Sequence, residues 1–106
     1  MSETVEMLLA ELKFGLQGLY AARLRGVYLY GSYARGEGER DSDLDVLIVL
    51  DRLDSYGAEV DRTSKLVSNI SLRYGISVSR VFVSEGQWQN SEGLFLANVR
   101  EESIPA

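Results

Sequence analysis

The five residues at positions 46–50, Val-Leu-Ile-Val-Leu, form an unbroken apolar segment that constrains the fold more than any other part of the sequence. Side chains of a strand alternate between its two faces, so a strand without polar positions must be covered on both faces. We therefore predict a central strand over residues 43–50. Two carboxylates, Asp43 and Asp45, open this strand and lie on one face of it.

The flanking sequence predicts three helices and two further strands. The helices are expected over residues 2 to about 24, from the end of a polar loop at 51–56 to about 74, and from 85 or 87 to about 100. The strands are expected over 27–30 and 76–83, and a further loop over 33–42. Gly26 is expected to stop the first helix and Gly75 the second. Pro105 is expected in a short tail, and Trp88, Phe95 and Leu96 in the core. The order of elements predicts an α+β fold, a small mixed sheet with helices packed mainly on one side.

A Gly-Ser pair lies close in sequence to the two aspartates. Gly31 and Ser32 follow the first predicted strand, and Asp43 and Asp45 open the second. Gly31 lets the backbone come close to a ligand, and Ser32 can cap a short helix whose N–H groups face an anion. If the two strands are antiparallel neighbours, the loop between them brings Ser32 and Asp43 to one edge of the sheet.

The spacing of the two aspartates predicts a metal site. Alternate residues of a strand have Cα atoms about 6–7 Å apart, and carboxylates that close repel each other unless a proton or a cation relieves them. Mg²⁺ favours one or two carboxylates together with phosphate oxygens and water. Two such ions can clamp the attacking and leaving oxygens of an in-line displacement. Asp43 and Asp45 are therefore candidate catalytic residues and metal ligands, and the pattern indicates a metal with a nucleoside triphosphate.

Composition excludes several other chemistries. The 106 residues, the size of one domain over 1–106, contain no Cys and no His, so a Cys or His zinc site, a Ser-His-Asp triad and a disulfide scaffold are ruled out. The net charge of −5 argues against a direct nucleic-acid partner. The acidic start and the lack of an apolar run of about 20 residues predict a cytoplasmic protein without a membrane partner.

Three elements, Gly31-Ser32, Ala34-Arg35-Gly36 and Ser42-Asp43-Leu44-Asp45, resemble the minimal nucleotidyltransferases of the DNA polymerase β-like superfamily. The resemblance is strongest over residues 27–50. It implies the polymerase β-like nucleotidyltransferase fold, with Gly31 and Ser32 binding the nucleotide and Asp43 and Asp45 holding two Mg²⁺ ions. Arg35, in the loop between these elements, either pairs with a phosphate or is only solvated.

One departure from the family pattern concerns a third carboxylate. The resemblance implies an acidic residue on a later strand, where it helps to hold a metal and activates the acceptor hydroxyl. The strand at 76–83 contains no Asp or Glu, and Ser77 or Ser79 stands at the corresponding place. General-base catalysis contributes about 10²–10⁴-fold, so this loss predicts a slow or an inactive enzyme.

Three functions are compatible with these residues. The first is transfer of a nucleoside monophosphate, AMP from ATP, to a hydroxyl, with the acceptor brought by a partner or by a second copy of the chain. The resemblance implies that the acceptor is a Tyr of a helical HEPN-type toxin, which makes the chain an antitoxin. The second is a non-catalytic protein that neutralises its partner by binding alone. The third is transfer to a small molecule such as an aminoglycoside.

Overall fold

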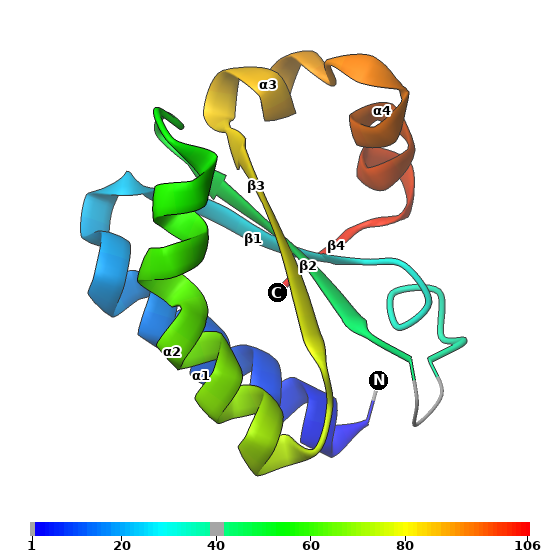
Figure 1. Ribbon diagram of the computed structural model, residues 1–106. Helices are drawn as coiled ribbons and strands as arrows, with labels where there is room; N and C mark the ends of the chain where they lie inside the picture. The colour runs from blue at the N-terminus through cyan, green and yellow to red at the C-terminus, as the bar shows by residue number, and fades with distance from the viewer. Residues whose placement is uncertain (1, 39–41) are drawn as a thin grey trace.

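The computed structural model describes residues 2–38 and 42–106, so part of the loop predicted over 33–42 lies outside the described residues. These residues form one four-stranded sheet and the helices that pack on it (Figure 1). In chain order the elements are α1 (Glu3–Tyr20), a 3-10 turn (Ala21–Arg23), β1 (Leu24–Tyr30), β2 (Leu44–Leu50), α2 (Tyr56–Tyr74), β3 (Val78–Ser84), α3 (Glu85–Asn90), α4 (Gly93–Glu102) and β4 (Ile104–Pro105).

The sheet is mixed, as predicted, and has the strand order β3-β2-β1-β4. The apolar strand β2 is central: it pairs antiparallel with β1 and parallel with β3. The tail, expected to be irregular, instead forms the edge strand β4, in which Ile104 pairs with Leu29 of β1. A two-residue strand is too short to show a periodic pattern, and Pro105 lies at an edge, where the lack of an N–H donor is tolerated.

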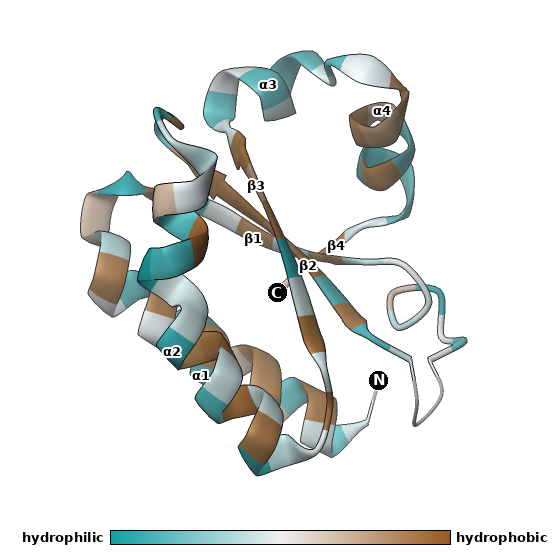
Figure 2. Cartoon of the chain, viewed as in Figure 1, coloured by the Kyte–Doolittle hydropathy of each residue, from teal (hydrophilic) through white to brown (hydrophobic). Residues whose placement is uncertain are grey.

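Helices cover both faces of β2. The two long helices, α1 and α2, cover one face and bury Leu44, Val46 and Ile48, whereas the two short helices, α3 and α4, cover part of the other face around Leu47 and Val49 (Figures 1 and 2). The predicted α+β class is therefore confirmed, with the main helical layer on one side. The five residues of the apolar segment 46–50 have at most 1% of their surface exposed, which is why that segment contains no polar position.

One predicted helix end differs from the observed one, and another agrees with it. The first helix ends at Tyr20 rather than near Leu24, and Gly26 lies inside β1, where the register with β2 shifts. A Cβ at Gly26 would lie 2.7 Å from the Tyr28 ring, so the glycine serves close packing at the bulge and not a helix stop. Gly75, with φ +67, ends α2 as predicted.

The last predicted helix is two helices. Ser91, with φ 48, and Gly93, with φ 85, adopt left-handed conformations that interrupt the helix between α3 and α4. Trp88 and Leu96 are buried as predicted, but the prediction that Phe95 lies in the core is wrong, because half of its surface is exposed. The break turns Phe95 toward the edge of the helical layer, where its ring contacts Tyr30.

A buried polar contact joins the two long helices. The Tyr20 hydroxyl donates to Glu59 Oε1 at 2.8 Å, and Arg62 Nε donates to the same oxygen at 2.9 Å. Burial raises the pKa of Glu59, but the hydrogen bonds from Tyr20 and Arg62 outweigh burial and leave that pKa below its ordinary value of 4.5. The charged carboxylate is thus satisfied inside the helical layer.

We predict that Tyr20→Phe lowers the free energy of unfolding by about 1–2 kcal/mol, because it removes a donor from a buried carboxylate. Urea denaturation at neutral pH measures the change. Tyr28→Phe, which keeps the ring that packs on Trp88, is the matched control and should change the value by less than about 0.5 kcal/mol. An equal loss in both variants would show that the Tyr20–Glu59 bond contributes little.

The same contact predicts an acid dependence. Because the pKa of Glu59 is lowered on folding, its contribution is complete above pH 4.5 and is lost as the pH falls through the lowered folded-state value. Tyr20→Phe weakens this coupling, so the variant should lose less stability than the wild type between neutral pH and that range. Parallel pH profiles for the two proteins would contradict this explanation.

Candidate active site

The predicted site residues lie at one end of the sheet, where β1 ends and β2 begins (Figure 1). Tyr30 and Asp45 are direct partners in the antiparallel pair, so Gly31 leaves β1 beside Asp45. The antiparallel arrangement needed to bring the two motifs together is therefore present. Figure 2 shows hydrophilic residues at this start of β2, next to the 31–38 loop.

Gly31 is required at its position by two independent features. Its φ is +75, a left-handed conformation that favours glycine. A Cβ built on it would also lie 2.4 Å from Asp45 Oδ2, a distance that side chains do not tolerate. The backbone of the Gly-Ser turn and the Asp45 carboxylate are therefore in direct contact.

The chain after Gly31 forms one helix-like turn. The N–H groups of Ala34 and Arg35 donate to the Gly31 carbonyl at 3.1 and 3.2 Å, and the Glu37 N–H donates to the Ser32 carbonyl at 2.8 Å. The turn brings the Arg35 N–H back to the Gly31 carbonyl, and the capping role expected of Ser32 stays a prediction.

The two aspartates differ in environment. Asp43 is exposed and precedes β2, which begins at Leu44 rather than at residue 43, whereas Asp45 is half-buried within the strand. Burial, followed by the nearby Asp43 charge, raises the pKa of Asp45, and Arg35 partly opposes the rise. A cation between the carboxylates would remove this penalty.

The donor set of this site fits magnesium. Carboxylates are hard oxygen ligands, and Mg²⁺ commonly takes one or two of them, with the remaining positions filled by phosphate and water. Among residues 2–38 and 42–106 no group of three or more acidic, His or Cys side chains is arranged to hold a metal. The fit therefore depends on Asp43 and Asp45 together with the oxygens of a bound substrate.

Of the two serines considered for the place of a third carboxylate, Ser79 lies beside Asp45 in the sheet. Ser79 is the register partner of Asp45 in the parallel β2–β3 pair, so both side chains lie on the same face of the sheet. Ser77, the other residue considered, precedes β3, and its carbonyl accepts from the Leu44 N–H at 2.8 Å. Of the two serines, the register therefore favours Ser79 as the position of the carboxylate that the resemblance implies.

Two residues of the site were not foreseen from the sequence. Glu102, at the end of α4, accepts a hydrogen bond from the Gly31 N–H at 3.1 Å and another from Arg35 Nη1 at 2.9 Å. These contacts hold the pKa of Glu102 below its ordinary value. Burial, with the nearby Asp45 charge, raises the pKa of Tyr30 to about 12. Glu102 carries no local signal in the sequence, because it reaches the Gly31 turn only in the folded chain, where β4 pairs with β1. Tyr30 was predicted only as the end of a strand.

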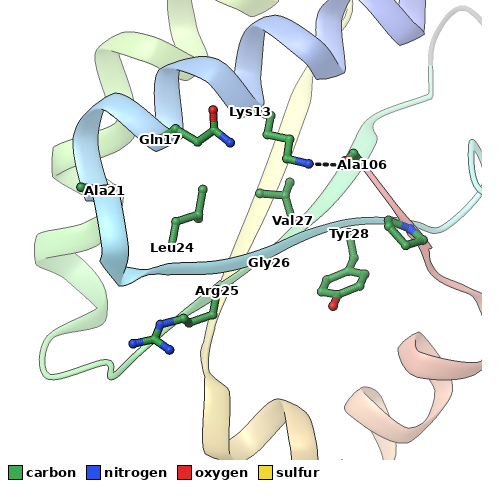
Figure 3. Close-up of a pocket in the computed structure, with 10 residues that line it drawn as sticks. Lys13, Gln17, Ala21, Leu24, Arg25, Gly26, Val27, Tyr28 and Ala106 are labelled. Atoms are coloured by element: carbon green, nitrogen blue, oxygen red, sulfur yellow. Dashed lines mark hydrogen bonds between the residues drawn. The ribbon is translucent and has the colours of Figure 1, made fainter.

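Two pockets lie near these elements. One, of about 210 Å³, lies behind the Gly-Ser turn and is lined by Tyr33, Gly36 and the start of α1. Another, of about 280 Å³, lies between α1 and β1; there Lys13 donates to the Ala106 carbonyl at 3.0 Å (Figure 3). Neither pocket contains an aspartate of the site, so the candidate site is defined by the contacts of Gly31, Arg35 and Asp45.

Comparison with known proteins gives a consistent family. Residues 9–93 match the nucleotidyltransferase domain. The chain is 32% identical over 98 residues to the Methanocaldococcus jannaschii protein named "Putative protein adenylyltransferase MJ0604", with 92% of each chain covered. The structure named "Structure of putative minimal nucleotidyltransferase" has a TM-score of 0.59 at 26% identity, over 95% of this chain and 94% of that one. A toxin-antitoxin crystal structure with AMP-PNP has a TM-score of 0.58 at 21% identity, over 89% and 68%.

The chain therefore belongs to the nucleotidyltransferase domain family and is a transferase of that family, as its motifs predict. Its resemblance to minimal nucleotidyltransferases is confirmed by the fold that it shares with the structure of the putative minimal nucleotidyltransferase, over nearly the whole of both chains. Within the residues that the structure describes, no helix is long and apolar enough to cross a membrane.

We predict that Gly31→Ala destabilises the protein by about 2 kcal/mol or more, because it combines backbone strain with a collision at Asp45. Gly36→Ala is the matched control: its φ is also positive, at +74, but a Cβ there has no atom of the described residues within 4 Å. It should cost only the strain, about 1 kcal/mol. Thermal unfolding of both variants measures the difference, and equal losses would mean that the Asp45 contact is easily relieved.

Proposed function

We propose that this chain transfers AMP from ATP to a hydroxyl group and releases pyrophosphate. Gly31, Ser32 and Arg35 receive the triphosphate, and Asp43 and Asp45 hold Mg²⁺, with two ions at the site. The observation that carries this proposal is the direct contact between the Gly-Ser turn and Asp45. It sets the phosphate-binding and metal-binding elements side by side, as an in-line phosphoryl transfer requires.

The residues of the chain have separable tasks in this reaction. Gly31 allows the substrate phosphates to approach the backbone, because no side chain intervenes. Arg35 neutralises phosphate charge with a guanidinium that suits phosphate geometry. Asp45, within the strand, and Asp43, just before it, would hold the metal, which would supply charge neutralisation for the attacking and leaving oxygens. The catalysis is thus largely positioning and electrostatics.

The acceptor is proposed to be a protein. The relative from Methanocaldococcus jannaschii is named a protein adenylyltransferase, which favours a protein acceptor here. The fold is shared with a toxin-antitoxin crystal structure. We extend the proposal to a Tyr of a HEPN-type toxin, which the chain modifies as an antitoxin in the cytoplasm. We propose that residues 1–106 form one domain and that the partner brings the hydroxyl to the open end of β2.

A second candidate function is neutralisation by binding alone. Ser79 favours it, because a hydroxyl beside Asp45 neither holds a metal as a carboxylate does nor removes a proton from the acceptor near neutral pH. Under this alternative the chain binds its partner without modifying it. The two functions differ in whether the aspartates are needed.

The test of the transfer is a substitution of the metal ligands. Wild type, Asp43→Asn and Asp45→Asn are incubated with ATP, Mg²⁺ and the helical protein encoded next to the chain, and intact mass spectrometry counts AMP units on that partner. We expect AMP on the partner with the wild type and at least a 10²-fold slower reaction with either variant. Asp54→Asn, at an exposed ion pair with Arg52, should react at the wild-type rate.

Each outcome of this test has a distinct meaning. Transfer that persists in Asp43→Asn would refute the assignment of the metal ligands. A partner that is neutralised by the wild type and by both variants, without any gain of AMP, would establish the binding function instead.

We further predict that Ser79→Asp accelerates the transfer by about 10²-fold, within the range that a general base supplies. The substitution places a carboxylate at the register position beside Asp45. Ser77→Asp, which adds the same charge before β3, is the matched control and should leave the rate within about threefold. Initial rates at saturating MgATP measure both, and an equal response would show that Ser79 is not the position of the missing carboxylate.

A further inference from the structure

Glu102 places its carboxylate on the turn that carries the proposed nucleotide-binding residues. Its Oε1 accepts from the Gly31 N–H at 3.1 Å, and its Oε2 accepts from Arg35 Nη1 at 2.9 Å. A backbone N–H and a guanidinium are donors that a phosphate group would also use. The Glu102 carboxylate thus occupies two hydrogen-bond donors that, under the proposed function, the nucleotide needs.

We propose that Glu102 is a built-in competitor of the triphosphate, which holds Gly31 and Arg35 until the nucleotide displaces it and so sets the affinity for nucleotide. This inference rests on the proposed function, because it assigns the same turn to the same ligand. It adds a residue that determines affinity and takes no part in the chemical step.

The charges around Arg35 require such a displacement. Arg35 Nε pairs with Glu37 Oε2 at 3.0 Å while Nη1 pairs with Glu102, so the single positive charge is shared by two carboxylates. A triphosphate brings several further negative charges to the same place. Like charges within a few Å repel each other, so the phosphate gains the full attraction of Arg35 only when Glu102 turns away.

The surroundings of Glu102 allow it to move without unfolding. Its side chain is 30% exposed and that of Arg35 is 45% exposed, so the pair is screened by water and easily exchanged for a stronger ligand. The backbone beyond it remains fixed, because Ile104 pairs with Leu29 in the sheet. Release therefore needs a new rotamer of one side chain and leaves α4 and β4 in place.

The experiment measures the dissociation constant for MgATP by isothermal titration calorimetry in wild type, Glu102→Gln and Glu101→Gln. The glutamine at 102 keeps the shape of the side chain but is a weaker, uncharged acceptor, so the dissociation constant should fall about five- to tenfold. Glu101→Gln removes the same charge from the adjacent, exposed residue and should stay within about twofold of the wild type. In transfer assays the effect should appear in KM for ATP and leave kcat unchanged.

An unchanged or higher dissociation constant in Glu102→Gln would overturn the inference, and a higher one would mean that Glu102 supports the turn for binding. Binding by the wild type in that case leaves the proposed function standing. Failure of every variant, including the wild type, to bind MgATP would refute both. If circular dichroism shows that Glu102→Gln does not fold, the same titration is made with Glu102→Asp. Its shorter side chain withdraws the negative charge from Arg35, so an unchanged dissociation constant for MgATP would overturn the inference.

Discussion

The antiparallel pairing of β1 with β2 is the constraint on which the site depends. Pairing Tyr30 with Asp45 fixes where Gly31 leaves the sheet, and the lack of a side chain there lets the backbone touch the Asp45 carboxylate. The burial of β2 on both faces holds this register, because a slip by one residue would turn Asp45 into the core of α1 and α2. The packing of the sheet and the chemistry of its end therefore depend on the same strand pair.

Much of this arrangement could be predicted from the sequence because its causes are local. The apolar run of β2, the Gly-Ser turn and the alternation that places Asp45 opposite Leu44 each depend on residues a few positions apart. The broken last helix and β4 could not be predicted, because left-handed Ser91 and a two-residue strand leave no periodic trace. Glu102 could not be predicted either, because its contacts with Gly31 and Arg35 arise only in the folded chain.

Within the described residues, the site brings several carboxylates together near Arg35, which pairs with Glu37 and Glu102. The pKa of Asp45 is raised chiefly by burial and then by the Asp43 charge. A divalent cation would neutralise such a group of carboxylates. A nucleotide that carries its own metal ion would bring this positive charge to the site.

The separation in sequence of the contacts at the Gly-Ser turn implies an order of assembly. Tyr30 and Asp45 are joined through a short hairpin connection, whereas Glu102 lies 71 residues from Gly31 and 67 from Arg35. Contacts between nearby residues close small loops and form early, and distant ones carry a larger entropic cost. During synthesis from the N-terminus, the turn and the two aspartates leave the ribosome well before α4 exists. The nascent chain thus passes through a stage in which Gly31 and Arg35 are already made and Glu102, which accepts their hydrogen bonds in the folded protein, is not.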